Sequence, residues 1–147
     1  MASVERFEDL VAWQKARQLR REIYRMTVDD KLRREFDYKS QVKRAAVSIM
    51  SNIAEGFERG GRAEFAQFLS TAKGSCAEVR SLLYVALDEE YIDRPTFSRL
   101  SAQAEEVARI IGGLRSAVAR QRDEQRKPRS QSSVLNPQSS TVPEGPP

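Results

Sequence analysis

Hydrophobic positions recur at helical spacing in four separate segments of the chain. In the most informative segment, residues 40–57, Val42, Ala46, Ile49, Ile53 and Phe57 are separated by steps of four, three, four and four. This period predicts an amphipathic helix with one buried face. Similar alternations of four and three occur at about residues 8–26, 62–89 and 93–118. Four helices joined by short links predict an all-α fold, an antiparallel up-down four-helix bundle.

Residue types that begin and end helices mark the limits of these segments. Ser40 is the predicted N-cap of the second helix, and the glycine pair at 60–61 is predicted to end it because glycine adopts the left-handed conformation freely. Asp93 is the predicted N-cap of the fourth helix, with Pro95 in its first turn. Inside the third helix, Gly74 costs about 1 kcal/mol relative to alanine. That cost predicts that another helix approaches closely at Gly74.

The polar face of the second helix carries unusually short side chains. Arg44, Ser48, Ser51 and Glu55 form a narrow stripe with Asn52 beside it. A solvated helix face more often carries long Lys and Glu side chains. Short Ser and Asn side chains, with the small residues Ala54 and Gly56 nearby, allow another backbone to come close. We therefore expect this helix to lie between one apolar and one polar packing partner, with Asn52 and Glu55 hydrogen-bonded to a neighbouring helix or a backbone terminus.

A second stripe runs along the first helix, where aromatic residues alternate with arginines. Trp13, Arg17, Arg20 and Tyr24 are spaced by four, three and four. The aromatic residues could flank the core while the arginines solubilise the helix, or the stripe could stack nucleic-acid bases. We favour a protein interface, because Trp, Tyr and Arg dominate binding hot spots. The predicted oligomer interface combines the two stripes: Trp13, Arg17, Arg20, Tyr24, Ser48, Asn52 and Glu55.

The charge of the chain is mildly basic. Its 147 residues, enough for one domain with a modest core, include 25 basic and 21 acidic residues, for a net charge of +4. This excess permits nucleic-acid binding without demanding it. In the connection before the second helix, Leu32, Phe36 and Tyr38 are expected to lie on the body. The basic side chains around them are usually solvated surface, but they are the leading candidates for a phosphate-binding surface: Lys31, Arg33, Arg34, Lys39, Lys43 and Arg44.

The composition argues against an enzyme. The chain has no histidine, which excludes Ser-His-Asp and Cys-His catalysis and the usual imidazole-containing metal sites. No glycine-rich phosphate loop is present either. Glu55 with Ser48 or Asn52 could be imagined as an acid–base group, but a lone carboxylate on a helix is far more often structural. We expect no catalysis, cofactor or metal.

The lone cysteine and the hydropathy pattern suggest a cytoplasmic location. Cys76 lies on the hydrophobic face of the third helix, so we expect a small buried residue in a reducing compartment. The sequence contains no apolar run near the length of about 18 residues that a membrane helix needs. We therefore expect no membrane association.

The C-terminal residues lack the hydrophobic pattern. From about Asp123 the chain is rich in Ser, Gln and Pro, which predicts a disordered tail over residues 123–147 after a bundle over residues 1–122. The tail begins with several basic residues that could add weak, salt-sensitive affinity for nucleic acid.

Three sequence stretches carry a resemblance to a known family. RAAVSIMSNIAEG at residues 44–56 closely resembles the central motif of the small four-helix-bundle proteins encoded in intervening sequences of bacterial 23S ribosomal RNA genes. FEDLVAWQKA at 7–16 and FAQFLSTAKGSCAEV at 65–79 are weaker echoes, and the resemblance covers about residues 7–118. Members usually carry Phe-Pro-x-x-Glu before the second helix. Here DDKLRREFDYKS has no proline, so the entry to that helix is expected to differ.

The resemblance implies an assembly and a class of function. Members of this family form pentameric barrels, and their relatives include accessory variability proteins of diversity-generating retroelements, which work with a reverse transcriptase and contact nucleic acid. The first hypothesis is therefore a homo-oligomeric scaffold, a pentamer by resemblance, that binds RNA or DNA. The second is an oligomeric adaptor with a protein partner, for example a reverse transcriptase, and no direct nucleic-acid role. An enzyme ranks last.

Overall fold

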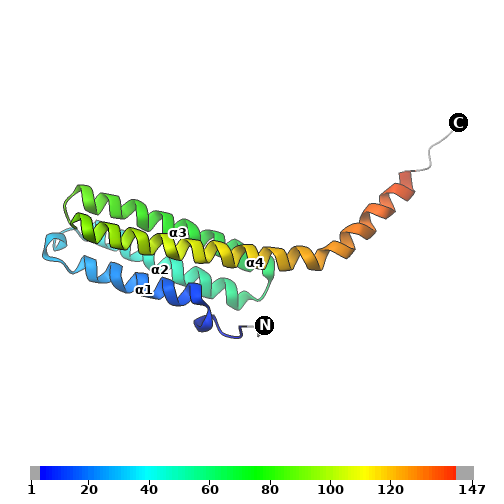
Figure 1. The fold of residues 1–147 in the computed structure, drawn as a ribbon, viewed down its shortest axis with the longest axis horizontal. Helices are drawn as coiled ribbons and strands as arrows, with labels where there is room; N and C mark the ends of the chain where they lie inside the picture. The colour runs from blue at the N-terminus through cyan, green and yellow to red at the C-terminus, as the bar shows by residue number, and fades with distance from the viewer. Residues whose placement is uncertain (1–3, 142–147) are drawn as a thin grey trace.

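Four helices pack side by side in the computed structural model, which describes residues 4–141 and the side chains of residues 4–121 (Figure 1). They are α1 (Val11–Thr27), α2 (Phe36–Arg59), α3 (Arg62–Asp88) and α4 (Arg94–Thr141), with short 3-10 turns at Phe7–Asp9 and Asp30–Leu32. Helices that follow one another in sequence pack together, and α1 closes the ring against α4. The predicted all-α four-helix bundle is confirmed.

The core consists of the residues that define the hydrophobic period. The α2 positions of this period are buried except Phe57, which is partly buried. The corresponding positions of α1 are all buried: Ala12, Ala16, Leu19, Ile23 and Met26. Burying a Leu or Ile side chain fully contributes roughly 1.5–3 kcal/mol, so this shared core accounts for most of the attraction between the helices. The largest fully buried side chains come from all four helices and from the 3-10 turn that ends at Leu32: Leu19, Ile23, Leu32, Ile49, Ile53, Leu69, Leu83, Leu100 and Ile111.

Two predicted helix ends are confirmed in atomic detail. Gly60 ends α2 in the left-handed conformation, with φ of 84°, and its N–H donates to the carbonyl of Phe57. Asp93 caps α4, because its carboxylate accepts a hydrogen bond from the backbone N–H of Thr96 at 2.9 Å. The hydrogen bonds from Thr96 hold the pKa of Asp93 below its usual range.

The predicted start of α2 is wrong. The helix begins at Phe36, so Ser40 lies one turn inside it, where its hydroxyl accepts a hydrogen bond from Arg44. A tertiary contact explains the earlier start. Tyr38 is buried, and its hydroxyl donates to the carbonyl of Leu82 on α3 at 2.6 Å, which fixes the first turn of α2 against the bundle.

The close approach expected at Gly74 is also wrong, because a Cβ there would meet no atom within 4 Å. The tight contact occurs at Gly56 instead. A Cβ at Gly56 would lie 2.5 Å from the Cβ of Phe68 and 3.1 Å from the ring of Phe65. The expectation that Gly56 lets another helix come close to α2 is therefore correct, and that helix is α3.

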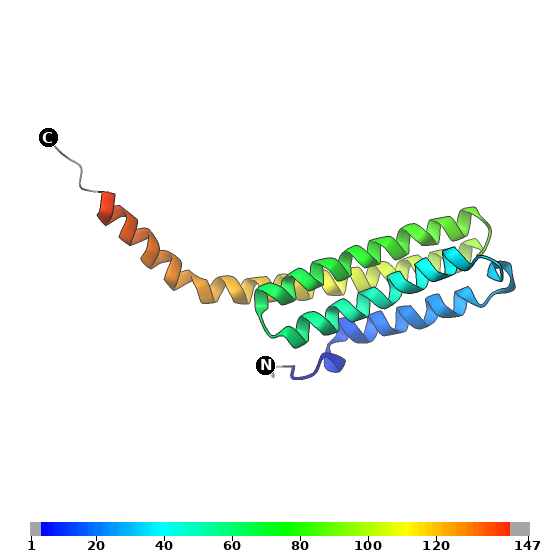
Figure 2. The same cartoon turned by 180° about the vertical axis from the view of Figure 1, so that it is seen from behind.

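Helix α4 is longer than the sequence pattern predicts. Its backbone continues as a helix to Thr141, and Figures 1 and 2 show this end projecting from the bundle. Helical hydrogen bonds are local, so a backbone can extend a helix without an apolar face to bury. The division into a bundle over residues 1–122 and a tail over 123–147 stays a prediction, and residues 142–147 lie outside the described part of the chain.

Candidate functional site

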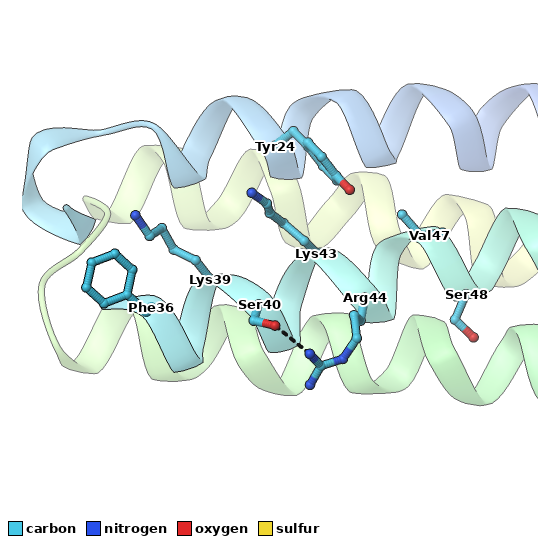
Figure 3. A pocket seen from close by; sticks show the side chains of 8 residues that line it. All are labelled: Tyr24, Phe36, Lys39, Ser40, Lys43, Arg44, Val47 and Ser48. Carbon is cyan, nitrogen blue, oxygen red and sulfur yellow. Dashed lines mark hydrogen bonds between the residues drawn. The ribbon is translucent and has the colours of Figure 1, made fainter. Parts of the chain in front are cut away.

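A groove of about 740 Å³ lies over the outer face of the first half of α2, bordered by α1 (Figure 3). We call it the α2 groove. It combines residues from the predicted phosphate-binding set with residues from the predicted interface set. Its lining consists of Tyr24 from α1 and seven residues of α2: Phe36, Lys39, Ser40, Lys43, Arg44, Val47 and Ser48.

Helical spacing and antiparallel packing gather these side chains. On α2 the lining positions form two adjacent rows, each with steps of three or four residues, and therefore cover one broad face. Tyr24 lies near the end of α1, which is antiparallel to α2, so its ring meets the beginning of α2. Figure 3 shows Lys39 and Lys43 pointing toward α1, and Arg44 pointing to the other side of the helix.

Aromatic rings hold the basic side chains of this region. Lys43 Nζ lies 5.1 Å from the centroid of the Tyr24 ring, and Arg20 Cζ lies 4.9 Å from the same ring. Lys39 Nζ lies 5.2 Å from the centroid of the Phe36 ring. Each such contact contributes about 0.5–1 kcal/mol at an exposed site. The rings orient the cations without neutralising their charge.

The positive charge of the groove is unpaired, unlike much of the arginine charge elsewhere on the bundle. Arg99 on α4, for example, pairs with Glu22 on α1 at 3.0 Å. Within the described part of the chain, no carboxylate lies within 4.0 Å of the basic groups in or beside the groove, which are Arg20, Lys39, Lys43 and Arg44. The groove therefore presents a positive surface that attracts anions.

The other half of the predicted basic set lies at the end of the bundle. Arg33 Nη1 lies 3.9 Å from Asp30 Oδ1. The backbone carbonyl of Arg33 accepts a hydrogen bond from Lys39 Nζ at 3.3 Å. Lys31 lines a separate small pocket beside acidic residues, including Asp93. Arg34 is exposed. The structure thus brings three of the six predicted cations together in the groove and places Lys31, Arg33 and Arg34 outside it.

The first half of the predicted interface stripe lies further along α1. Trp13 is partly buried, with its ring centroid 5.2 Å from that of Phe7 in an edge-on contact. Arg17 is exposed and its Cζ lies 5.6 Å from the centroid of the Trp13 ring. Trp13 and Arg17 do not line the groove, whereas Tyr24 does.

The polar stripe of α2 is tied to α3 through Ser48. The hydroxyls of Ser48 and Ser75 are hydrogen-bonded at 2.9 Å. Asn52 Nδ2 donates to the carbonyl of Ser48 at 2.8 Å and to its hydroxyl at 3.0 Å. Asn52 therefore bonds to its own helix, not to a neighbouring one as expected, and reaches α3 only through Ser48.

Glu55 also has its partner on α2. Its carboxylate accepts a hydrogen bond from Arg59 at 2.9 Å, and Arg59 reaches Glu64 on α3 at 3.4 Å. The expected direct bond from Glu55 to another helix is wrong. Ser48 lies seven residues away, about 10 Å along the helix axis. The acid–base pair that could be imagined between Glu55 and Ser48 is not formed.

Sequence reasoning missed the role of Phe36. We expected Phe36 to lie on the body beside Leu32 and Tyr38; those two are buried, whereas Phe36 is 69% exposed. The available signal was the spacing of Phe36, Lys39 and Lys43, which places them on one face once the helix begins at Phe36.

The described residues contain neither a membrane-spanning helix nor a metal-binding cluster. None of their helices combines the length and apolarity needed to cross a bilayer. No cluster of three or more His, Cys, Asp or Glu side chains suited to a metal ion occurs in residues 4–121. Cys76 is buried as expected, and burial raises the pKa of its thiol to about 12, which keeps the thiol protonated and unreactive.

A family model described as 23S rRNA-intervening sequence protein matches residues 8–113, which is well over half of the chain. The chain belongs to this family. The matched segment includes all four bundle helices as far as Gly113 and the entire α2 groove. The resemblance of the three sequence stretches is thereby confirmed.

A solved structure supports the fold of this chain. The bundle is similar to a protein of unknown function from the S23 ribosomal protein family of Bacteroides thetaiotaomicron, with a TM-score of 0.65 and 24% identity over 71% of this chain and 97% of that chain. At this identity the similarity shows the fold alone. A comparison with curated proteins gives no match.

Proposed function

We propose that this protein is a non-catalytic homo-oligomer that binds RNA or DNA through the α2 groove. The observation that carries the proposal is the unpaired charge of Lys39, Lys43 and Arg44 in one groove, where Phe36 and Tyr24 hold the two lysines against their rings. Cations interleaved with aromatic rings suit a strand that offers both phosphates and bases.

The two aromatic residues have different roles in this proposal. Tyr24 is partly buried and carries Arg20 and Lys43 against its ring, so it orients cations. Phe36 is largely exposed, so its ring is open to an unpaired base. Stacking of this kind is tolerant of sequence and requires bases that are not paired in a duplex. We therefore expect a preference for single strands and little dependence on base sequence.

Oligomerisation would strengthen this binding. One groove offers few phosphate contacts, whereas a ring of grooves presents them at high effective concentration and raises avidity by a factor of about 10² or more. Family membership supports an assembly, and the resemblance points to five subunits. The lone Cys76 suits the reducing cytoplasm, where we place the protein.

An adaptor function is the alternative. The partly buried Trp13 with the exposed Arg17 over its ring is the type of surface that forms a binding hot spot. In that case the stripe of α1 would bind a protein partner, for example a reverse transcriptase, and nucleic acid would have no direct role.

Binding at low salt tests the proposal. The purified full chain is titrated into labelled single-stranded RNA, single-stranded DNA and a duplex, and fluorescence anisotropy gives the affinity. We expect saturable binding to the single strands, weaker binding to the duplex, and loss of affinity in Lys39→Gln/Lys43→Gln. Absence of binding to every probe at low salt would overturn the nucleic-acid proposal and favour the adaptor.

A further inference from the structure

A second cleft, of about 690 Å³, lies between α3 and α4. We call it the α3–α4 cleft. The α2 groove is lined by α1 and α2, so the cleft lies on the opposite face of the bundle. Figure 1 shows the first part of α4 side by side with α3. Neither the family description nor the resemblance assigns anything to this cleft.

The cleft carries more positive than negative charge. Three basic side chains line it, Lys73, Arg80 and Arg109, against one carboxylate, that of Glu105. Arg80 Nη2 pairs with Glu105 at 3.2 Å, which offsets one charge. No carboxylate of the described residues lies within 4.0 Å of Lys73 or Arg109. Arg80 Nε is buried without a hydrogen-bond partner in that same part of the chain.

Two consecutive glycines form part of the cleft wall. A Cβ at Gly112 would meet Lys73 Nζ at 3.7 Å, an ordinary contact, and a Cβ at Gly113 would meet no atom within 4 Å. Packing inside the bundle therefore does not require glycine at either position. Both glycines are present although glycine makes a helix interior less stable than alanine does. Their effect is to keep open the space that the basic side chains surround.

We propose that the α3–α4 cleft is a second anion site that binds a phosphate group. Arg80 and Arg109 supply planar forks of N–H donors, which match phosphate oxygens, and Lys73 supplies a compact charge. The bare wall at Gly112 and Gly113 leaves room for the phosphate oxygens. The phosphate belongs either to a nucleic-acid backbone or to a free phosphate compound. The proposal does not depend on the α2 groove.

Nuclear magnetic resonance of the arginine Nε–H groups tests this site directly. The ¹⁵N-labelled full chain is titrated at low salt with inorganic pyrophosphate and, separately, with a short single-stranded oligonucleotide. We expect the Arg80 Nε–H resonance to shift and saturate. In Lys73→Gln/Arg109→Gln the affinity should fall about tenfold or more, because two charge-assisted contacts are lost. Lys73 and Arg109 are exposed, so this variant should stay folded, which circular dichroism checks.

A control variant separates the site from general charge effects. Arg94→Gln/Arg120→Gln removes two exposed cations of α4 outside the cleft, and should keep the affinity of the unmodified chain. Equal loss in the cleft variant and the α4 control would overturn the proposal.

The two probes distinguish the sources of the phosphate. Saturation by pyrophosphate alone points to a free phosphate compound, and tighter saturation by the oligonucleotide points to a nucleic-acid backbone. Either result supports the site if Lys73→Gln/Arg109→Gln binds the same probe more weakly. An Arg80 resonance that does not respond to either probe would show that the cleft binds no phosphate.

Discussion

At the scale of single residues, two helix glycines show where packing decides and where helix propensity decides. Gly56 is buried, and a Cβ there would lie 2.5 Å from the Cβ of Phe68, whereas a Cβ at Gly74 would meet nothing within 4 Å. The sequence reveals that both glycines lie inside helices, but not which one faces a neighbouring side chain. The rotation of α2 against α3 decides which glycine faces a neighbouring side chain, and the sequence does not reveal this rotation. The close approach was therefore predicted correctly at Gly56 and wrongly at Gly74.

The two glycines therefore predict opposite effects of alanine. Gly56→Ala should lower the free energy of unfolding by about 1–3 kcal/mol, because the methyl group forces α2 and α3 apart. Gly74→Ala should raise it by about 0.5–1 kcal/mol, because alanine favours the helix and has open space. Urea denaturation measures both. The same sign of change in the two variants would contradict this packing.

The buried thiol of Cys76 predicts a loss of stability at alkaline pH. Burial raises the pKa of Cys76 from its ordinary value of 9.0 to about 12 in the folded chain. The unfolded chain therefore releases this proton first as the pH rises. The contribution of the protonated Cys76 thiol to the free energy of unfolding is fully present below about pH 9. As the pH rises toward 12, this contribution is lost at about 1.4 kcal/mol per pH unit. Between pH 9 and 11, the free energy of unfolding should fall less steeply in Cys76→Ala than in the unmodified chain. Parallel slopes would show that the thiol is not held protonated.

At the scale of elements, the period of α2 was readable from the sequence and its beginning was not. The buried face over Val42, Ile49 and Ile53 follows from spacing alone. The first turn depends on the Tyr38 hydroxyl bonding to Leu82, a contact between residues 44 positions apart. Because the predicted helix began at Ser40, the alignment of Phe36 and Lys39 with Lys43 was missed, and with it the shape of the groove.

The exposed ring at the start of α2 predicts a specific effect on single-strand binding. Phe36→Leu should weaken binding to single-stranded RNA by about tenfold, since stacking of one base contributes about 1–3 kcal/mol. Stability should change little because Phe36 is largely exposed. Val28→Ser, which removes another exposed apolar side chain outside the groove, is the matched control. Equal affinities of the two variants for the single strand would remove base stacking from the proposed function.

At the scale of the whole molecule, the bundle presents different chemistry on different faces. The α2 groove and the α3–α4 cleft are basic and lie on opposite sides, and Trp13 with Arg17 lies on α1 outside both. The sequence gives the four helices and their buried faces. The Trp13–Arg17 surface also follows from the spacing along α1. The groove and the cleft do not, because each combines residues from two helices. The oligomeric state, the pentamer expected from the resemblance, stays a prediction.

Assembly is tested by the mass in solution. Light scattering after gel filtration should report several subunits at micromolar concentration. Arg17→Ala should lower that mass without unfolding the chain, because Arg17 is exposed. Trp13→Ala should lower the mass further and also reduce stability, since Trp13 packs against Phe7. A stable monomer of the unmodified chain, or an unchanged mass in both variants, would reject this interface.

The salt dependence of single-stranded RNA binding tests the α2 groove most directly. For each subunit that touches the strand, removing two phosphate contacts in Lys39→Gln/Lys43→Gln should reduce the log–log salt slope by about 1.4, because each contact to a single strand contributes about 0.7. Arg94→Gln/Arg120→Gln loses the same charge outside the groove and should keep the slope of the unmodified chain. A groove variant with an unchanged slope, or a control with an equally reduced one, would contradict binding through the α2 groove.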